Sequence, residues 1–283
     1  MNPANRFDLT GRTALVTGAA RGIGHGIALA LAEHGADVIV HDLDENGTAK
    51  QVAEQIRGLG RRAWAMGQDL RQTDQLAQLA GRAWSTAGKI DILVNNAGMG
   101  HLEHFDEITL EHWRQVMSIN LDAPFFLTQA IAPRMIESGI KGRIINITSK
   151  NSLVAEAGLA SYNASKGGLE LLTQSLAIEL GRYNITVNAI APGCIDTDIG
   201  KGFPLDQAFF DYRNDHIPLG HRLGKVQEIA GAAVFLASDA SSYMTGQHLV
   251  IDGGMLCQQH PRMQFMPPSR HRPSKCDITP RND

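Results

Sequence analysis

Short apolar runs alternate with longer amphipathic segments along the first 255 residues of the chain. The short runs are apolar at nearly every position, are rich in Val, Ile, Leu and Ala, and end in turn residues. This pattern is typical of strands that are buried on both faces of a parallel sheet. It predicts seven strands, at residues 13–17, 37–41, 62–66, 91–94, 143–147, 185–190 and 248–251.

The longer segments carry apolar residues at helical spacing, and several of them end at a glycine. We predict helices over residues 23–34, 49–59, 73–86, 120–137, 161–181 and 226–236, and an irregular stretch over 193–216. Regular alternation of strand and helix, joined by right-handed crossovers, builds a parallel sheet with helices on both faces. The predicted fold is therefore α/β: a single-domain Rossmann-type doubly wound, seven-stranded parallel sheet.

Composition narrows the class of protein. With 283 residues and 43% hydrophobic residues, the chain can bury a sizeable core, which excludes disorder throughout. A formal net charge of −3 gives no electrostatic footprint for nucleic acid. The three cysteines, Cys194, Cys257 and Cys276, fit neither a disulfide framework nor a zinc pattern. Without a signal peptide or a long apolar run, we expect a cytoplasmic protein that neither crosses a membrane nor binds nucleic acid.

The composition changes near residue 255. Residues 256–283 contain five prolines and five Lys or Arg residues, and no strand or helix period persists at that proline density. We therefore expect one domain over residues 1–255, followed by a C-terminal extension over 256–283 that is partly disordered.

The turn after the first predicted strand indicates a nucleotide site. Gly18, Gly22 and Gly24 lie where that strand passes into the first helix. Backbone N–H groups at a helix N-terminus bind phosphate when no side chains stand in the way. Asp42 ends the second strand, where a carboxylate accepts hydrogen bonds from ribose hydroxyls and repels a 2′-phosphate. This favours NAD over NADP, although Arg21 in the turn weakly favours the opposite.

Further motifs follow in a characteristic order, and with them the chain resembles the classical short-chain dehydrogenases/reductases over about residues 8–255. Besides the glycine-rich turn, the motifs are Asp69-Leu70, Asn95-Asn96-Ala97-Gly98, Asn120, Ser149, Tyr162-x3-Lys166, and Pro192-Gly193 with Thr197. The resemblance implies a cofactor site formed by Gly18, Arg21, Gly22, Ile23, Gly24, Asp42, Asp69, Leu70, Asn96, Gly98, Tyr162, Lys166, Pro192, Gly193, Ile195 and Thr197.

The residue types in these motifs suit hydride-transfer chemistry. Tyr162 and Lys166 are four residues apart on a predicted helix, so they share one face. A free tyrosine has a pKa of about 10, and we expect the neighbouring ammonium and an oxidised nicotinamide to lower it. Tyr162 is then the general acid/base. The resemblance implies that Ser149 holds the substrate oxygen, Lys166 also binds the nicotinamide ribose, and Asn120 maintains a water-linked proton path.

The substrate is less defined. The expected substrate loop spans about 194–216, and His101, Asn151, Glu156 and Phe203 are candidate lining residues. Several stretches resemble gluconate 5-dehydrogenases, so we expect a secondary alcohol or ketone of a sugar, sugar acid or polyol. His101 and Lys150 are the candidate cations for a carboxylate substrate.

Two other functions remain open: a 3-oxoacyl thioester reductase, and a regulatory protein that binds NAD without turnover. The resemblance also implies a homotetramer that packs through the helices at 120–137 and 161–181. No metal is expected, because the pairs His101/His104 and His216/His221 lack a third ligand.

Overall fold

The computed structural model describes residues 6–197 and 206–257. Seven parallel strands form one sheet in the order β3-β2-β1-β4-β5-β6-β7, which confirms the predicted fold. The strands are β1 (Thr13–Thr17), β2 (Asp37–Asp42), β3 (Ala63–Gly67), β4 (Ile92–Asn95), β5 (Arg143–Ile147), β6 (Thr186–Pro192) and β7 (His248–Ile251).

The strand order reverses between β1 and β4. The chain builds outward from β1 to β3, then crosses back to β4 on the other side of β1. In open parallel sheets, ligands bind beyond the carboxyl ends of the strands at such a reversal. The topology therefore places the candidate site where β1 and β4 end.

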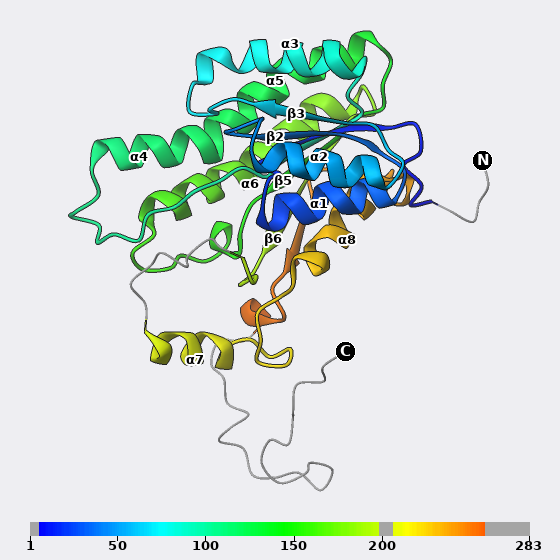
Figure 1. Ribbon diagram of the computed structural model, residues 1–283. Coiled ribbons are helices and arrows are strands. Elements are labelled where there is room, and N and C mark those ends of the chain that lie inside the picture. The colour runs from blue at the N-terminus through cyan, green and yellow to red at the C-terminus, as the bar shows by residue number, and fades with distance from the viewer. Residues whose placement is uncertain (1–5, 198–205, 258–283) are drawn as a thin grey trace, which may run out of the picture.

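Two helical layers cover the sheet (Figure 1). One hydrophobic cluster joins a face of the sheet to α1 (Gly22–Glu33), α2 (Thr48–Gly58) and α8 (Val226–Ala237). A second joins the opposite face to α3 (Leu76–Ala87), α5 (Ala123–Glu137) and α6 (Ala160–Gly181). Within β1, Ala14 and Val16 belong to the first cluster and Leu15 to the second, because successive side chains of a strand point to opposite faces. Short 3₁₀ turns lie at Thr73–Gln75, Lys150–Ser152, Asp239–Ser241 and Met255–Cys257.

The helix predictions were wrong in two places. Helix α4 (Leu110–Met117) was not predicted, and α7 (Gln207–Asp215) lies in the stretch that was expected to be irregular. Neither has a full apolar stripe: α4 buries only Val116, and α7 buries no residue. Figure 1 shows α7 set apart from both helical layers. The helix expected from residue 120 begins at Ala123, after a π-helical turn at Ser118–Asp122.

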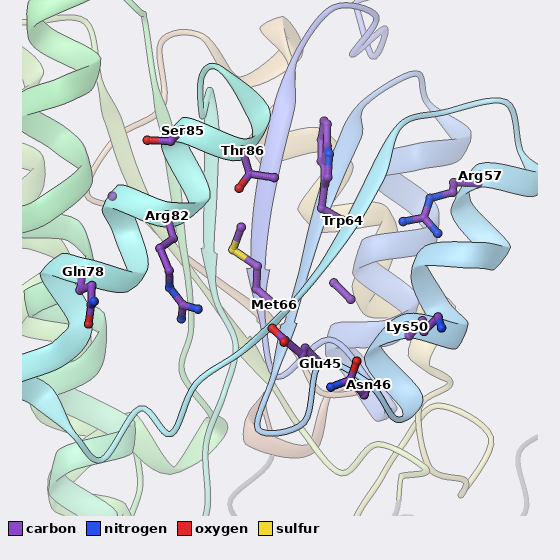
Figure 2. Close-up of a pocket in the computed structure, with 12 residues that line it drawn as sticks. Glu45, Asn46, Lys50, Arg57, Trp64, Met66, Gln78, Arg82, Ser85 and Thr86 are labelled. Carbon is purple, nitrogen blue, oxygen red and sulfur yellow. The ribbon is translucent and has the colours of Figure 1, made fainter.

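A pocket lies along the free edge of β3, between α2 and α3 (Figure 2). Arg57 of α2 donates to the Ala63 carbonyl from Nε at 3.1 Å and from Nη2 at 2.7 Å. At the other end of the strand, Arg82 of α3 donates to the Gly67 carbonyl at 3.2 Å, and Glu45 Oε2 accepts the Gly67 N–H at 3.1 Å. These side chains thus form hydrogen bonds with backbone N–H and C=O groups that an edge strand would otherwise leave exposed.

Among the described residues, no helix has the length and apolar character needed to cross a membrane.

Candidate active site

The glycine-rich turn between β1 and α1 has a shape that other residues do not fit. Gly18 and Gly22 have φ values of +61° and +56°, in the left-handed region. A Cβ on Gly24 would lie 2.2 Å from the Gly18 carbonyl oxygen and 2.4 Å from Asn96 Nδ2. No side chain caps the N-terminus of α1, so its first N–H groups are available to a ligand. This bare, positively polarised helix end fits a pyrophosphate.

Asn96 and Thr17 hold this turn in place through hydrogen bonds. Asn96 Nδ2 donates to the Thr17 carbonyl at 2.9 Å and to the Gly18 carbonyl at 3.1 Å. Thr17 Oγ1 accepts the backbone N–H groups of Asn96 and Ala97 at 3.0 and 3.1 Å. The amide group of Asn96 therefore supports the backbone of the turn. The contribution of Thr17 was missed in the sequence, because a threonine that ends a strand carries no distinctive signal.

Asp42, at the end of β2, is held against the same turn. Its Oδ2 accepts the Ala20 N–H at 3.1 Å, and its Oδ1 accepts the Leu43 N–H at 2.8 Å. Two further carboxylates, Asp44 and Glu45, follow within three residues. Arg21 is exposed beside the turn. The charge around the carboxyl end of β2 is consequently negative, with three carboxylates and one guanidinium.

Asp69 and Leu70 follow β3. Asp69 accepts hydrogen bonds from Arg71 Nε at 3.0 Å and Nη2 at 2.7 Å, and these bonds hold the pKa of its carboxyl below the usual value. Leu70 is buried in the second core cluster. Arg71 was not among the predicted site residues, although it orients Asp69.

The loop after β6 reaches the glycine-rich turn. The Thr197 methyl group lies 3.6 Å from the position of a Cβ on Gly22. Pro192 ends β6, and a Cβ on Gly193 would lie 2.6 Å from the Asp252 backbone. Ile195 pairs with Gly224 in an isolated bridge and packs against the first core cluster, as does Ile23 of α1. These predicted residues therefore share one end of the sheet.

The predicted catalytic residues also meet there. Tyr162 and Lys166 lie on α6, and the Lys166 ammonium is 5.7 Å from the centroid of the Tyr162 ring. The Ser149 hydroxyl is close enough to the Tyr162 hydroxyl to lower its pKa. Lys166 Nζ donates to the Ile147 carbonyl at 2.8 Å. A Cβ on Gly98 would come within 3.4 Å of the same ammonium, so the segment after β4 closes over it.

Asn120 lies in the π-helical turn, fully buried. Its Nδ2 donates to the Met99 carbonyl at 2.8 Å and to Ser165 Oγ at 3.0 Å, while its Oδ1 accepts the Met99 N–H at 2.9 Å. The amide thereby joins α6 to the segment after β4. Such π turns inside helices occur frequently at functional sites.

Burial shifts the pKa values of both Tyr162 and Lys166. Desolvation lowers the pKa of Lys166 to about 8. Desolvation also raises the pKa of Tyr162, against the hydrogen bond with Ser149, which lowers it, and the charge of Glu156 raises it further. The neighbouring ammonium by itself predicts a lowered pKa for Tyr162, but in the protein alone burial has the larger effect on that pKa.

The candidate substrate residues divide into two groups. Asn151 and Glu156 are hydrogen-bonded to each other, and Lys150 is paired with Glu156. His101 instead stacks on His112, with the two ring centroids 4.3 Å apart. His112 Nδ1 lies 2.5 Å from Glu103 Oε1. Phe203 falls outside the described residues. In the described part of the chain, no group of three or more His, Cys, Asp or Glu residues could hold a metal ion.

Comparison with known proteins places this geometry in context. A family model described as enoyl-(acyl carrier protein) reductase matches residues 18–256. An L-rhamnose 1-dehydrogenase (NAD(P)(+)) of Sphingomonas sp. is 38% identical over 247 residues, which cover 87% of this chain and 97% of that protein. A 2-dehydro-3-deoxy-D-gluconate 5-dehydrogenase of Escherichia coli is 40% identical over 252 residues, which cover 89% and 98%.

A solved structure of a similar protein has the same fold. The gluconate 5-dehydrogenase of Burkholderia cenocepacia, in complex with NADP and tartrate, superposes with a TM-score of 0.85 at 38% identity, covering 90% of this chain and 98% of the other. The motifs, the strand order and these matches lead to one conclusion: the chain belongs to the short-chain dehydrogenase/reductase family of oxidoreductases.

Proposed function

We propose that this protein interconverts an alcohol and a carbonyl group of a sugar, sugar acid or polyol, with NAD as its cofactor. The observation that carries this proposal is that Ser149, Tyr162 and Lys166 gather beyond the carboxyl ends of the strands, at the same end of the sheet as the uncapped N-terminus of α1. Relatives that act on sugars and sugar acids, at 38% to 40% identity over nearly their whole length, support the substrate class.

Each catalytic side chain has a defined task in this proposal. Ser149 donates a hydrogen bond to the substrate oxygen and holds it against the Tyr162 hydroxyl. Tyr162 takes the alcohol proton in oxidation and returns it in reduction. Lys166 binds the nicotinamide ribose and favours the phenolate electrostatically. Asn120 keeps the surrounding backbone in place for a water-linked proton path. When bound, NAD accepts the hydride and NADH supplies it.

The cofactor half of the site comprises residues from the turn, the ends of β2 and β3, the segment after β4 and the loop after β6. Gly18, Gly22 and Gly24 leave room for the pyrophosphate, and Asn96 supports their backbone. In the proposal the other contributors are Arg21, Ile23, Asp42, Asp69, Leu70, Gly98, Pro192, Gly193, Ile195 and Thr197.

The carboxylates at the end of β2 support NAD rather than NADP. Asp42, Asp44 and Glu45 lie within four positions, and a 2′-phosphate would be repelled by this concentration of negative charge. Relatives differ on this point: the Burkholderia cenocepacia structure holds NADP, and the Sphingomonas enzyme is named for both cofactors.

Exposed apolar side chains support a homotetramer. Ile178 and Leu171 of α6 are 83% and 65% exposed, and Phe126 of α5 is 38% exposed. Large apolar side chains on adjacent helices are typical of subunit contacts, which in homo-oligomers obey closed symmetry.

Initial rates with NAD and NADP test the proposal, using neutral sugars, polyols, aldonates and an acetoacetyl thioester. Turnover of a sugar, polyol or aldonate with NAD is expected. Tyr162→Phe should lower kcat by about 10²–10⁴-fold while NADH binding, followed by fluorescence, is retained. Turnover of the thioester alone, with NADPH, would identify a 3-oxoacyl reductase instead. NADH binding without turnover of any substrate would identify a regulatory protein.

A further inference from the structure

A closed network of polar side chains follows Ser149. The Lys150 side chain is 10% exposed, and its ammonium donates to Asn151 Oδ1 at 3.0 Å and to Glu156 Oε2 at 2.8 Å. Asn151 Nδ2 donates to Asn163 Oδ1 at 2.8 Å. Asn163 Nδ2 returns to the Glu156 carbonyl at 2.9 Å. A network in which the members bond one another is rigid and fixes the position of each charge.

This network adjoins the reacting groups. The Asn151 N–H donates to Ser149 Oγ at 3.1 Å, and Asn163 is the next residue after Tyr162. The Glu156 charge raises the pKa of Tyr162, so the carboxylate is close enough to act on the phenol electrostatically. The Lys150–Glu156 pair therefore lies near the position where Ser149 and Tyr162 would hold a substrate oxygen.

The pairing of the two charges determines what those neighbouring groups can be. An ammonium has three N–H donors, and two of the Lys150 donors are directed to Asn151 and Glu156, which leaves one for a ligand. A hydroxyl can accept from Lys150 and donate to Glu156 at the same time. A carboxylate would gain Lys150 but would also meet the Glu156 carboxylate, and like charges at a partly buried site repel strongly.

We propose that the Lys150–Glu156 pair makes the enzyme select uncharged polyhydroxy substrates, neutral sugars and polyols, over sugar acids. The inference rests on the proposed function, and narrows its substrate class. The pair binds hydroxyl groups near the reacting carbon, and the Glu156 carboxylate disfavours an anionic substrate.

Arg213 of α7 is the competing cation. Its guanidinium lies 5.0 Å from the Phe210 ring centroid, and its Nη2 donates to Asn214 Oδ1 at 3.4 Å. In the described part of the chain its enclosed Nε has no hydrogen-bond partner. The charges of Arg213 and Lys150 both act on the buried Cys194 thiol, so α7 faces the same end of the sheet. If the substrate were a sugar acid, Arg213 would be its carboxylate partner.

Matched substrate pairs test the inference on the full-length protein. D-Glucitol and D-gluconate share their secondary hydroxyls and differ in one terminal carboxylate, as do D-glucose and D-glucuronate. In each pair that is oxidised, the wild type should prefer the neutral member by at least about tenfold in kcat/KM. Glu156→Gln should shift the ratio toward the acid by about tenfold, mainly through KM, and lower the apparent pKa of the pH–rate profile. Glu54→Gln, at an exposed position of α2, is the matched control and should change neither.

Two results would overturn the inference while the proposed function stands. One is a wild type that oxidises the acid member better and loses that activity in Arg213→Met. The other is a Glu156→Gln variant whose substrate ratio equals that of the wild type. Failure of the proposed function has a different signature, because no sugar, polyol or aldonate would then be turned over by the wild type.

Discussion

The two halves of the candidate site lie at the same end of the sheet, beyond the carboxyl ends of the strands, but are held by different forces. In the cofactor half, backbone groups approach so closely that a Cβ on Gly24 has no room, and Asn96 and Thr17 fasten the turn. In the substrate half, Lys150 and Glu156 hold each other through side-chain charge. A cofactor shared by many enzymes can be recognised by a fixed backbone, whereas a particular substrate is distinguished by side chains. Substitutions should therefore act by steric exclusion in the first half and by charge in the second.

The largest effect is expected at Lys166, where the two halves join. Lys166→Met removes the ammonium beside Tyr162 and its bond to the Ile147 carbonyl, and should lower kcat/KM by about 10²–10⁴-fold. Steady-state kinetics with NAD measure the loss, and a thermal melt shows whether the variant is folded. Lys50→Met, in the pocket at β3, should leave the rates unchanged. A folded Lys166→Met enzyme within tenfold of the wild type would disprove the role of the lysine.

The next effect should appear at Gly24. Gly24→Ala forces the turn apart, because the new methyl group would lie 2.2 Å from the Gly18 carbonyl oxygen. We expect the Kd for NADH to rise at least about tenfold, as followed by fluorescence titration. Gly58→Ala is the matched control: a Cβ there meets nothing within 4 Å, so NADH binding should be unchanged. Equal Kd values for the two variants would show that the turn does not form the pyrophosphate site.

The stability of the protein should depend on pH through His41. Burial lowers the pKa of this β2 histidine to about 4 from its ordinary 6.5. The unfolded chain therefore binds a proton below about pH 6.5 that the native protein binds only below about pH 4, so the free energy of unfolding falls as the pH drops through this window. His41→Leu should remove up to about 3 kcal/mol of that fall. Urea unfolding at pH 7 and pH 4 measures it, and identical pH dependence in both proteins would contradict the prediction.

The smallest effect concerns cofactor choice. Asp42→Asn keeps an acceptor for the Ala20 N–H but removes the charge, so kcat/KM with NADP relative to NAD should rise about tenfold. Asp44→Asn removes a neighbouring charge and should have a smaller effect. An unchanged ratio in Asp42→Asn would show that the ribose 2′ position does not lie beside Asp42.

The sequence predicted the regions in which local pattern determines structure. Buried strands and their glycine turns have a periodic signal, so the seven-stranded sheet and the gathering of Ser149, Tyr162 and Lys166 followed from it. Helices α4 and α7 gave no such signal, since they bury one residue and none.

Contacts between side chains could not be predicted from the pattern of hydrophobic and polar residues. Lys150 was considered as a cation for a carboxylate substrate, but its pairing with Glu156 depends on how residues 150–156 fold back on themselves. The direction of the Tyr162 pKa shift likewise depends on burial, which a helix spacing does not reveal.

The guarded edge of β3 has a consequence for growth of the sheet beyond one molecule. Arg57, Arg82 and Glu45 occupy backbone groups that a foreign strand would need. Edge-to-edge growth of a sheet into an open-ended fibre needs two free edges, and the β3 edge of this sheet is protected. The side chains of Arg57, Arg82 and Glu45, which come from α2, α3 and the loop after β2, therefore act against polymerisation through this edge of the sheet.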